Sequence, residues 1–130
     1  MVDAGQVVRR ILVVDDSGAF RRAAADLLVL RGYEVAGSAG DGPAAVDAAS
    51  RGCPDGVLLD VNLPDVDGLA VARALAEVCP AASIVLTSAE VQDVPAAELA
   101  SCGAAGFVPK EELAVVDLAR WFGTAAGCRR

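Results

Sequence analysis

Carboxylates at the ends of apolar runs are the residues of this sequence best suited to chemistry. Asp60 ends the run at 56–60, and the pair Asp15 and Asp16 follows a second run at 11–14. If both runs are parallel strands, three carboxylates meet at one edge of one sheet. Like charges held this close cost stability unless a metal ion or a basic group offsets them. The pattern therefore predicts a site for a hard cation and for chemistry on an acidic oxygen.

Five apolar runs alternate with helical patterns, and these predict the elements that carry the site. We expect strands at 10–14, 34–38, 56–60, 83–86 and 106–108. We expect helices from the Ser17 cap to Gly32 and at 43–51, 69–78, 95–103 and 111–122. Strands rich in Val, Ile and Leu are buried on both faces, and their alternation with helices implies parallel strands with right-handed crossovers. The sequence predicts a doubly wound (βα)5 five-stranded parallel sheet of the flavodoxin-like, α/β class.

The polar residues that interrupt these runs gather at the carboxyl ends of the predicted strands. Thr87 follows the fourth strand and Lys110 follows the fifth, in line with the three aspartates. Open parallel sheets bind ligands at these ends, near the point where the strand order reverses. Lys110 is the only lysine beside ten arginines, which indicates that a compact ammonium is needed there and not a guanidinium fork.

Length, composition and charge limit the classes of protein. The chain has 130 residues, of which 55% are hydrophobic and 22% charged, which suits one folded domain. A net charge of −7 with scattered basic residues argues against nucleic-acid binding by this chain. No apolar run approaches the roughly 20 residues of a transmembrane helix. We expect one domain at 9–122, with flexible termini at 1–8 and 123–130.

The cysteines at 53, 79, 102 and 128 form no CxxC pair, and the chain has no histidine. A zinc site is therefore disfavoured. Since no signal peptide is evident, we expect reduced thiols and a cytoplasmic location.

Four segments carry a family resemblance: VVDDS at 13–17, LLDVNLPDVDG at 58–68, VLTS at 85–88 and CGAAGFVPK at 102–110. In order and spacing they resemble the receiver domain of two-component response regulators. The resemblance covers about residues 9–122. It implies that Asp60 is the phosphoacceptor. It also implies a Mg²⁺ site formed by Asp15, Asp16, Asp60 and the backbone carbonyl of Asn62.

The resemblance further implies a switch that responds to the phosphoryl group. Thr87 would bond a phosphoryl oxygen, with Ser88 as its substitute if the strand ends one residue later. Lys110 would pair first with Asp60 and then with the phosphoryl group, and Phe107 would be the switch aromatic. Glu111 stands where the family often has proline, which leaves the shape of the loop around Lys110 open.

The resemblance also implies partners and an output surface. A sensor histidine kinase or a phosphotransfer protein would supply the phosphoryl group. The face of the fourth helix, fifth strand and fifth helix would bind an output partner or a second copy, and it includes Ala97, Ser101, Phe107 and Trp121. The stretch at 106–113 looks closer to receivers joined to helix-turn-helix output domains. The chain is thus either a single-domain regulator or part of a longer protein.

Two alternatives stand beside this interpretation. A receiver-like module could signal by protein contact without phosphorylation. A haloacid-dehalogenase-like phosphatase would use the strand at 10–14, but it needs a carboxylate where Ser17 stands. No GxGxxG motif follows the first strand, which disfavours a dinucleotide-binding enzyme. We expect no enzymatic activity beyond the chain's own phosphorylation and dephosphorylation.

Overall fold

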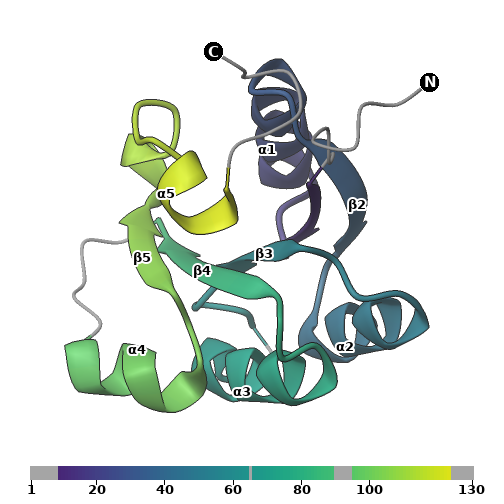
Figure 1. The fold of residues 1–130 in the computed structure, drawn as a ribbon, viewed down its shortest axis with the longest axis vertical. Helices are drawn as coiled ribbons and strands as arrows, with labels where there is room; N and C mark the ends of the chain where they lie inside the picture. The colour runs from purple at the N-terminus through teal and green to yellow at the C-terminus, as the bar shows by residue number, and fades with distance from the viewer. Residues whose placement is uncertain (1–8, 65, 90–94, 124–130) are drawn as a thin grey trace.

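Five parallel strands form the centre of the molecule, in the order β2-β1-β3-β4-β5 (Figure 1). The computed structural model describes residues 9–64, 66–89 and 95–123. The strands are β1 (Arg10–Val14), β2 (Glu34–Ala39), β3 (Gly56–Asp60), β4 (Ser83–Ser88) and β5 (Gly106–Pro109). The strand order reverses at β1, which lies between β2 and β3. The predicted doubly wound parallel sheet is confirmed, and the observed strand order is the flavodoxin-like one.

Helices cover both faces of the sheet (Figure 1). One face carries α1 (Gly18–Leu30) and α5 (Ala119–Phe122). The other carries α2 (Gly42–Arg51), α3 (Gly68–Val78) and α4 (Ala96–Cys102). Successive residues of a strand point to opposite faces of the sheet. In β1, Ile11 and Val13 pack in the core under α1, and Leu12 and Val14 pack in the core under α2 and α3. Nearly every strand residue of β1, β3 and β4 is buried, as the apolar runs predicted.

Side-chain caps fix where the first three helices begin. Ser17 Oγ accepts from the Phe20 N–H at 3.2 Å, and Asp41 Oδ1 accepts from the Ala44 N–H at 2.8 Å. Asp67 caps α3 in the same way. These acceptors satisfy N–H groups that have no partner within a helix. The predicted bounds hold to within one or two residues in the first four helices and all strands.

The last predicted helix is wrong between residues 113 and 118. Lys110–Glu112 forms a 3-10 turn, η1, and α5 covers only Ala119–Phe122. Arg31, the C-cap residue of α1, donates from its guanidinium to the carbonyl oxygens of Ala114 and Val116. In a continuous helix, backbone N–H groups four residues later would donate to these carbonyl oxygens. Here the carbonyl oxygens accept from Arg31 instead.

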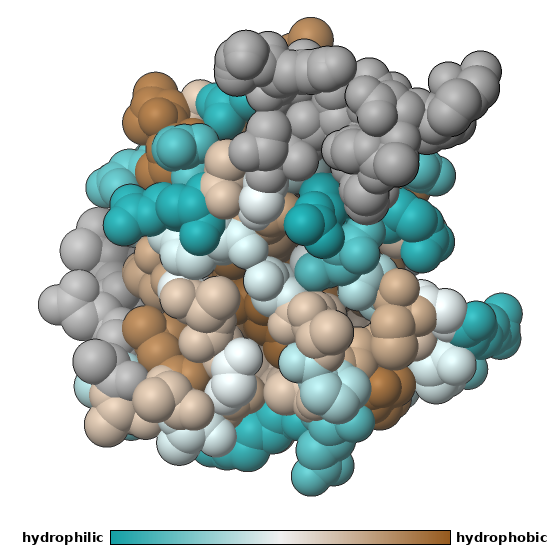
Figure 2. Space-filling view, viewed as in Figure 1, coloured by the Kyte–Doolittle hydropathy of each residue, from teal (hydrophilic) through white to brown (hydrophobic). Residues whose placement is uncertain are grey.

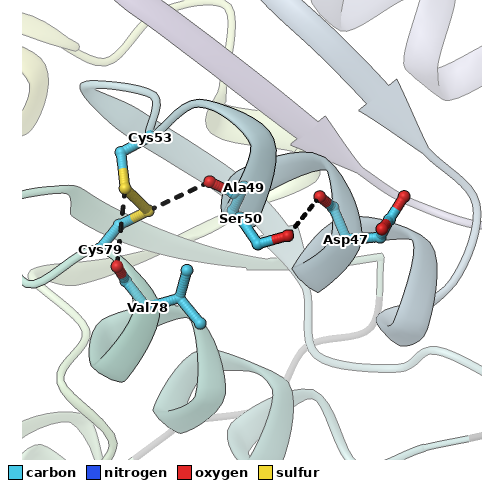
Figure 3. The surroundings of a disulfide bond; sticks show 6 residues. All are labelled: Asp47, Ala49, Ser50, Cys53, Val78 and Cys79. Atoms are coloured by element: carbon cyan, nitrogen blue, oxygen red, sulfur yellow. Dashed lines mark hydrogen bonds between the residues drawn. A yellow bond between two sulfur atoms is a disulfide. The ribbon is translucent and has the colours of Figure 1, made fainter.

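The prediction that all cysteines are reduced is also wrong. Cys53 and Cys79 form a disulfide whose Cα atoms lie 5.6 Å apart (Figure 3). Cys53 follows α2 and Cys79 caps α3, and the packing of these two helices brings the sulfur atoms together. Among the described residues, Cys102 is the free cysteine and is buried. Cys128 lies outside the described residues.

Hydrophobic and hydrophilic residues are interspersed over the face shown in Figure 2. Four large hydrophobic side chains are exposed on the described part of the chain, namely those of Val29, Leu30, Val78 and Val115. Within 9–64, 66–89 and 95–123, no helix combines the length and apolarity that crossing a membrane requires. The predicted flexible termini fall outside the described residues apart from Gly123, which caps α5.

Candidate functional site

The structure brings Asp15, Asp16 and Asp60 together at the carboxyl edge of the sheet. One oxygen from each carboxylate lies within 4.8 Å of the other two. The neighbouring strands β1 and β3 place them: Val14 pairs with Leu59, the acidic pair follows Val14 directly, and Asp60 is the last residue of β3. Asp15 is fully buried and Asp60 is 4% exposed, whereas Asp16 is exposed. The predicted convergence of three carboxylates is therefore present.

The two oxygens of Asp60 have different neighbours. Oδ1 accepts from the backbone N–H of Asn62 at 2.9 Å, while Oδ2 lies 3.5 Å from Lys110 Nζ. The Asn62 side chain points elsewhere, since its Nδ2 donates to Ser88 Oγ at 2.7 Å. Asp60 is thus held in position by the loop that follows it, and Oδ2 is the oxygen closer to the ammonium.

Lys110 lies between two carboxylates and an aromatic ring. Its Nζ is 2.6 Å from Asp15 Oδ2, in a charge pair that lacks hydrogen-bond geometry. The same atom lies 4.2 Å from the centre of the Phe20 ring, within cation–π range. The Lys110 ammonium and the Arg21 guanidinium, which donates to the Asp15 carbonyl, do not fully offset three carboxylates, so the site keeps a net negative charge. Such a set of hard oxygen donors suits a small divalent cation.

The pKa of the Asp60 carboxyl is raised above its usual value. Burial is the main cause, because it disfavours the charged form, and the charge of Asp15 acts in the same direction. The Asn62 N–H and the Lys110 ammonium oppose this effect and lower the pKa. These surroundings are therefore unfavourable for a negative charge on Asp60.

Thr87 lies beside Asp60 in the sheet, as their paired positions on β4 and β3 show. Its side chain is fully buried, and Oγ1 has no hydrogen-bond partner in the described part of the chain. An unpaired buried hydroxyl is costly and uncommon in a native structure. β4 continues through Ser88, so Thr87 belongs to the strand and does not follow it.

Phe107 is half-buried on β5, where it pairs with Leu86 and packs against the core under α2 and α3. The β5 residue that pairs with Thr87 is Val108. Of the other residues predicted for the output face, Ala97 and Ser101 are exposed and Trp121 is half-buried. The peptide bonds around Lys110 are trans, which fixes the loop geometry that the sequence left open.

Two residues of the site were not predicted from the sequence. The Phe20 ring packs against the core under α1 and also lies beside the Lys110 ammonium. Arg21 is half-buried, and its Nη1 donates to the carbonyl oxygen of Asp15 at 2.6 Å. Both lie in the first turn of α1, which begins at Gly18 directly after the acidic pair and the cap residue Ser17.

Comparison with known proteins agrees with this geometry. The model of the response regulator receiver domain matches residues 11–118. The chain belongs to that family. The match runs from Ile11 in β1 to beyond β5 and includes Asp15, Asp16 and Asp60. The resemblance inferred from four short motifs is therefore confirmed. The dehalogenase-like alternative has no support from this match.

Individual relatives show how the receiver is used elsewhere. The chemotaxis protein CheY of Thermotoga maritima is 33% identical over 102 residues, which cover 78% of this chain and 85% of CheY. A protein-glutamate methylesterase/protein-glutamine glutaminase of Archaeoglobus fulgidus is 38% identical over 110 residues, 84% of this chain. This chain spans only 32% of the length of that relative. The receiver therefore occurs both nearly alone and within longer proteins.

Among solved structures, a complex of CheX and CheY with BeF3 and Mg from Borrelia burgdorferi superposes with a TM-score of 0.73. The sequence identity is 25%, and the match covers 91% of this chain and 86% of that one.

Proposed function

We propose that this chain is a phosphoacceptor receiver that takes a phosphoryl group on Asp60 and thereby changes the binding properties of its α4–β5–α5 face. The observation that carries the proposal is the buried Asp60 carboxylate, 3.5 Å from the ammonium of Lys110 and within 4.8 Å of the Asp15 and Asp16 oxygens. The site needs no base, because a carboxylate is itself a nucleophile.

Phosphoryl transfer would proceed by attack of an Asp60 oxygen on the phosphorus of the donor. A bond forms between that oxygen and phosphorus, and the bond from phosphorus to the donor nitrogen or oxygen breaks, with its electron pair leaving on the donor. The donor would be a phosphohistidine of a sensor kinase or phosphotransfer protein, or a small acyl phosphate. The work of the protein is to position Asp60 and to offset charge.

The residues present fit a magnesium ion. Asp15, Asp16 and Asp60 supply carboxylate oxygens, and we assign the Asn62 backbone carbonyl as a fourth ligand. The clustering of the three carboxylates, with a net negative charge, supports a divalent cation here. When bound, Mg²⁺ would neutralise charge on the phosphoryl oxygens during transfer. The Borrelia burgdorferi complex, solved with Mg and BeF3, lends support by similarity.

Thr87 and Lys110 would carry the response. The unpartnered Oγ1 of Thr87 gains an acceptor once a phosphoryl oxygen lies above Asp60, which removes the cost of an unpaired hydroxyl. Lys110, already 3.5 Å from Asp60, would pair with another phosphoryl oxygen. Movement of β4 and β5 would then repack Phe107 and alter the face that includes Ala97, Ser101 and Trp121, where a partner or a second copy binds. Ser88, already bonded to Asn62, is a weaker candidate than Thr87.

The test is the intact mass of the protein after incubation with acetyl phosphate, with and without Mg²⁺. We expect wild type to gain one phosphoryl group only with Mg²⁺ and Asp60→Asn to gain none. Asp26→Asn is the matched control, because it removes an exposed carboxylate from α1 and should leave uptake unchanged.

Phosphoryl uptake by the Asp60→Asn variant would mean that Asp15 or Asp16 is an acceptor. That result would overturn the assignment of Asp60. If wild type gains nothing, a phosphorylated histidine-containing phosphotransfer protein replaces acetyl phosphate as donor. No transfer from that donor would favour a receiver that acts by protein contact without phosphorylation.

A further inference from the structure

The Cys53–Cys79 disulfide lies at the amino ends of the strands, whereas the acidic site lies at their carboxyl ends. Cys53 precedes β3 and Cys79 precedes β4, whereas Asp60 ends β3. A strand of five residues separates the two edges by roughly 17 Å. Chemistry at the sulfur atoms therefore does not use any residue of the proposed phosphorylation site.

The two cysteines differ sharply in exposure. Cys53 is exposed, while Cys79 is 2% exposed and belongs to the core under α2 and α3. A thiolate arriving from solvent can reach the Cys53 side of the bond but not the Cys79 side. Bridges that are accessible in this way exchange more readily than bridges buried on both sides.

Each sulfur atom also lies near a backbone carbonyl oxygen that could accept a hydrogen bond from the thiol after reduction. Cys53 Sγ lies 3.6 Å from the carbonyl oxygen of Val78, and Cys79 Sγ lies 3.6 Å from that of Ala49 (Figure 3). A disulfide sulfur has no proton to donate, but a thiol would donate weakly to either oxygen. Cys102 shows the same arrangement as a free buried thiol, with its Sγ 3.4 Å from Leu99 O.

The fold does not depend on the bridge for its core. The two clusters that flank the sheet contain more than twenty buried apolar side chains, and Cys79 would remain in one of them as a small hydrophobic residue when reduced. Domains that need disulfides to fold are usually much smaller. Opening the bridge therefore leaves most of the buried core in place.

We propose that Cys53 and Cys79 form a second, reversible modification site, at which Cys53 undergoes thiol–disulfide exchange with a low-molecular-weight thiol and Cys79 resolves the product. This inference goes beyond the proposed phosphoryl transfer and does not rest on it. A thiolate RS⁻ attacks Cys53 Sγ and forms Cys53–S–S–R. The bond to Cys79 Sγ breaks, and the leaving thiolate takes a proton from water.

A second thiolate then attacks the sulfur of the R group. It forms RSSR and releases Cys53, which is protonated. Two electrons have passed from two RSH molecules to the protein, and the disulfide RSSR reverses the sequence. In the oxidising direction, the buried Cys79 attacks the mixed disulfide on Cys53 and restores the bridge.

The test uses the full chain with Cys128→Ser, which removes the cysteine outside the described residues. Folded protein is equilibrated in glutathione buffers of varied reduced-to-oxidised ratio, quenched with acid and analysed by intact mass after alkylation. Tryptic cleavage after Arg51, Arg73 and Lys110 separates Cys53, in fragment 52–73, from Cys79 and Cys102, in fragment 74–110.

We expect the bridge to open and close with the buffer ratio while the circular dichroism stays native. Oxidised glutathione should trap one glutathionyl group on Cys53 in the Cys79→Ser variant. It should react with Cys79 roughly tenfold more slowly in the Cys53→Ser variant, because Cys79 is buried.

Three results would overturn the proposal. The bridge could stay closed until the protein unfolds, which would make it a fixed structural link. The thiols could stay reduced at every ratio. The two single variants could trap glutathione equally, which would remove the division of roles. If a variant fails to fold, the titration of the Cys128→Ser protein with both cysteines present decides between an exchanging bridge and a fixed one.

Discussion

In the proposed phosphoryl transfer, Asp60 attacks phosphorus as an anion, yet the surroundings of its carboxyl group disfavour that charge. Burial raises the pKa of the carboxyl above its unfolded value, so the folded state binds a proton over a pH window in which the unfolded state has lost it. The free energy of unfolding therefore falls as pH rises from the unfolded pKa, about 3.9, through the higher folded pKa. Above that window the full cost of the charge is present.

Asp60→Asn should accordingly stabilise the protein at about pH 7 in EDTA, where no divalent ion offsets the charge. We expect a gain of about 1 kcal/mol in the free energy of unfolding, which should shrink as pH falls toward 4. Urea titrations of wild type and Asp60→Asn across this range measure it, with Asp26→Asn as an exposed control. A variant less stable than wild type at neutral pH would mean that Lys110 and Asn62 outweigh the cost of burial.

Single residues of the site differed in how far sequence reasoning could place them. The positions of Asp15, Asp60 and Lys110 were predictable because each residue ends a strand or directly follows one, and the carboxyl ends of parallel strands lie together. The contact of Phe20 with Lys110 was not, because it depends on the path of the loop into α1. Neither was the contact of Asn62 with Ser88, which requires β4 to run past Thr87.

At the scale of elements, α3 is held close to the loop after Asp60 by the absence of a side chain at Gly68. A Cβ there would lie 2.7 Å from the carbonyl oxygen of Val61, which belongs to the backbone and cannot swing away. The Gly68 N–H also bonds to that oxygen, at 3.3 Å. The start of α3 and the loop that positions Asp60 are therefore packed backbone to backbone.

Gly68→Ala should lower the free energy of unfolding by about 2 kcal/mol or more, because the two backbones must separate. Gly52→Ala is the matched control, since a Cβ at Gly52 meets no atom within 4 Å and its φ of 179° suits any residue. That variant should be unchanged or gain up to about 1 kcal/mol. Chemical denaturation of both variants measures the difference. Equal stabilities would show that the loop after Asp60 moves away from α3 at little cost.

The segment between η1 and α5 depends on Arg31. Its guanidinium binds the carbonyls of Ala114 and Val116, and Asp117 Oδ1 accepts from the Ala119 N–H at 3.2 Å to start the short last helix. The apolar spacing at 111–122 predicted one helix. That pattern contains only local residues, and Arg31 lies 85 positions before Val116 in the chain.

Arg31→Ala should release these carbonyls and raise hydrogen exchange at residues 113–118 by roughly tenfold, with little change in the sheet. Arg31→Lys is the control for charge, because a lysine cannot reach both oxygens with a planar fork. Exchange followed by mass spectrometry measures the change. Unaltered exchange in the alanine variant would mean that packing of Leu113 and Leu118 fixes the segment instead.

At the scale of the whole molecule, two sites occupy opposite edges of one sheet. The disulfide closes a loop between residues separated by 26 positions and should contribute about 3 kcal/mol through the entropy of the unfolded chain. Mg²⁺ should stabilise the folded state by binding at the other edge. With no residue shared between them, the two effects should be independent.

Urea unfolding of oxidised and reduced protein, each with and without Mg²⁺, tests this independence. We expect the two contributions to add to within about 0.5 kcal/mol. A larger discrepancy would reveal that the bridge between α2 and α3 is coupled to the acidic pocket, for example through Gly68 at the start of α3.

The parallel, doubly wound arrangement was predictable because apolar runs alternate with helical patterns and crossovers are right-handed. The bridge was not, because Cys53 and Cys79 lie in separate loops and meet only when α2 packs beside α3. Pairing rules based on sequence spacing carry no information about such neighbours.

Trp121 is the only tryptophan of the chain, and its indole packs directly over Gly106 on β5, where a side chain would collide with it. Gly106 immediately precedes Phe107 in the strand. Any displacement of this strand alters the polarity and packing around the indole, and therefore its emission. The protein thus carries an intrinsic optical reporter at the proposed output face, and stopped-flow fluorescence can time a rearrangement there without a dye.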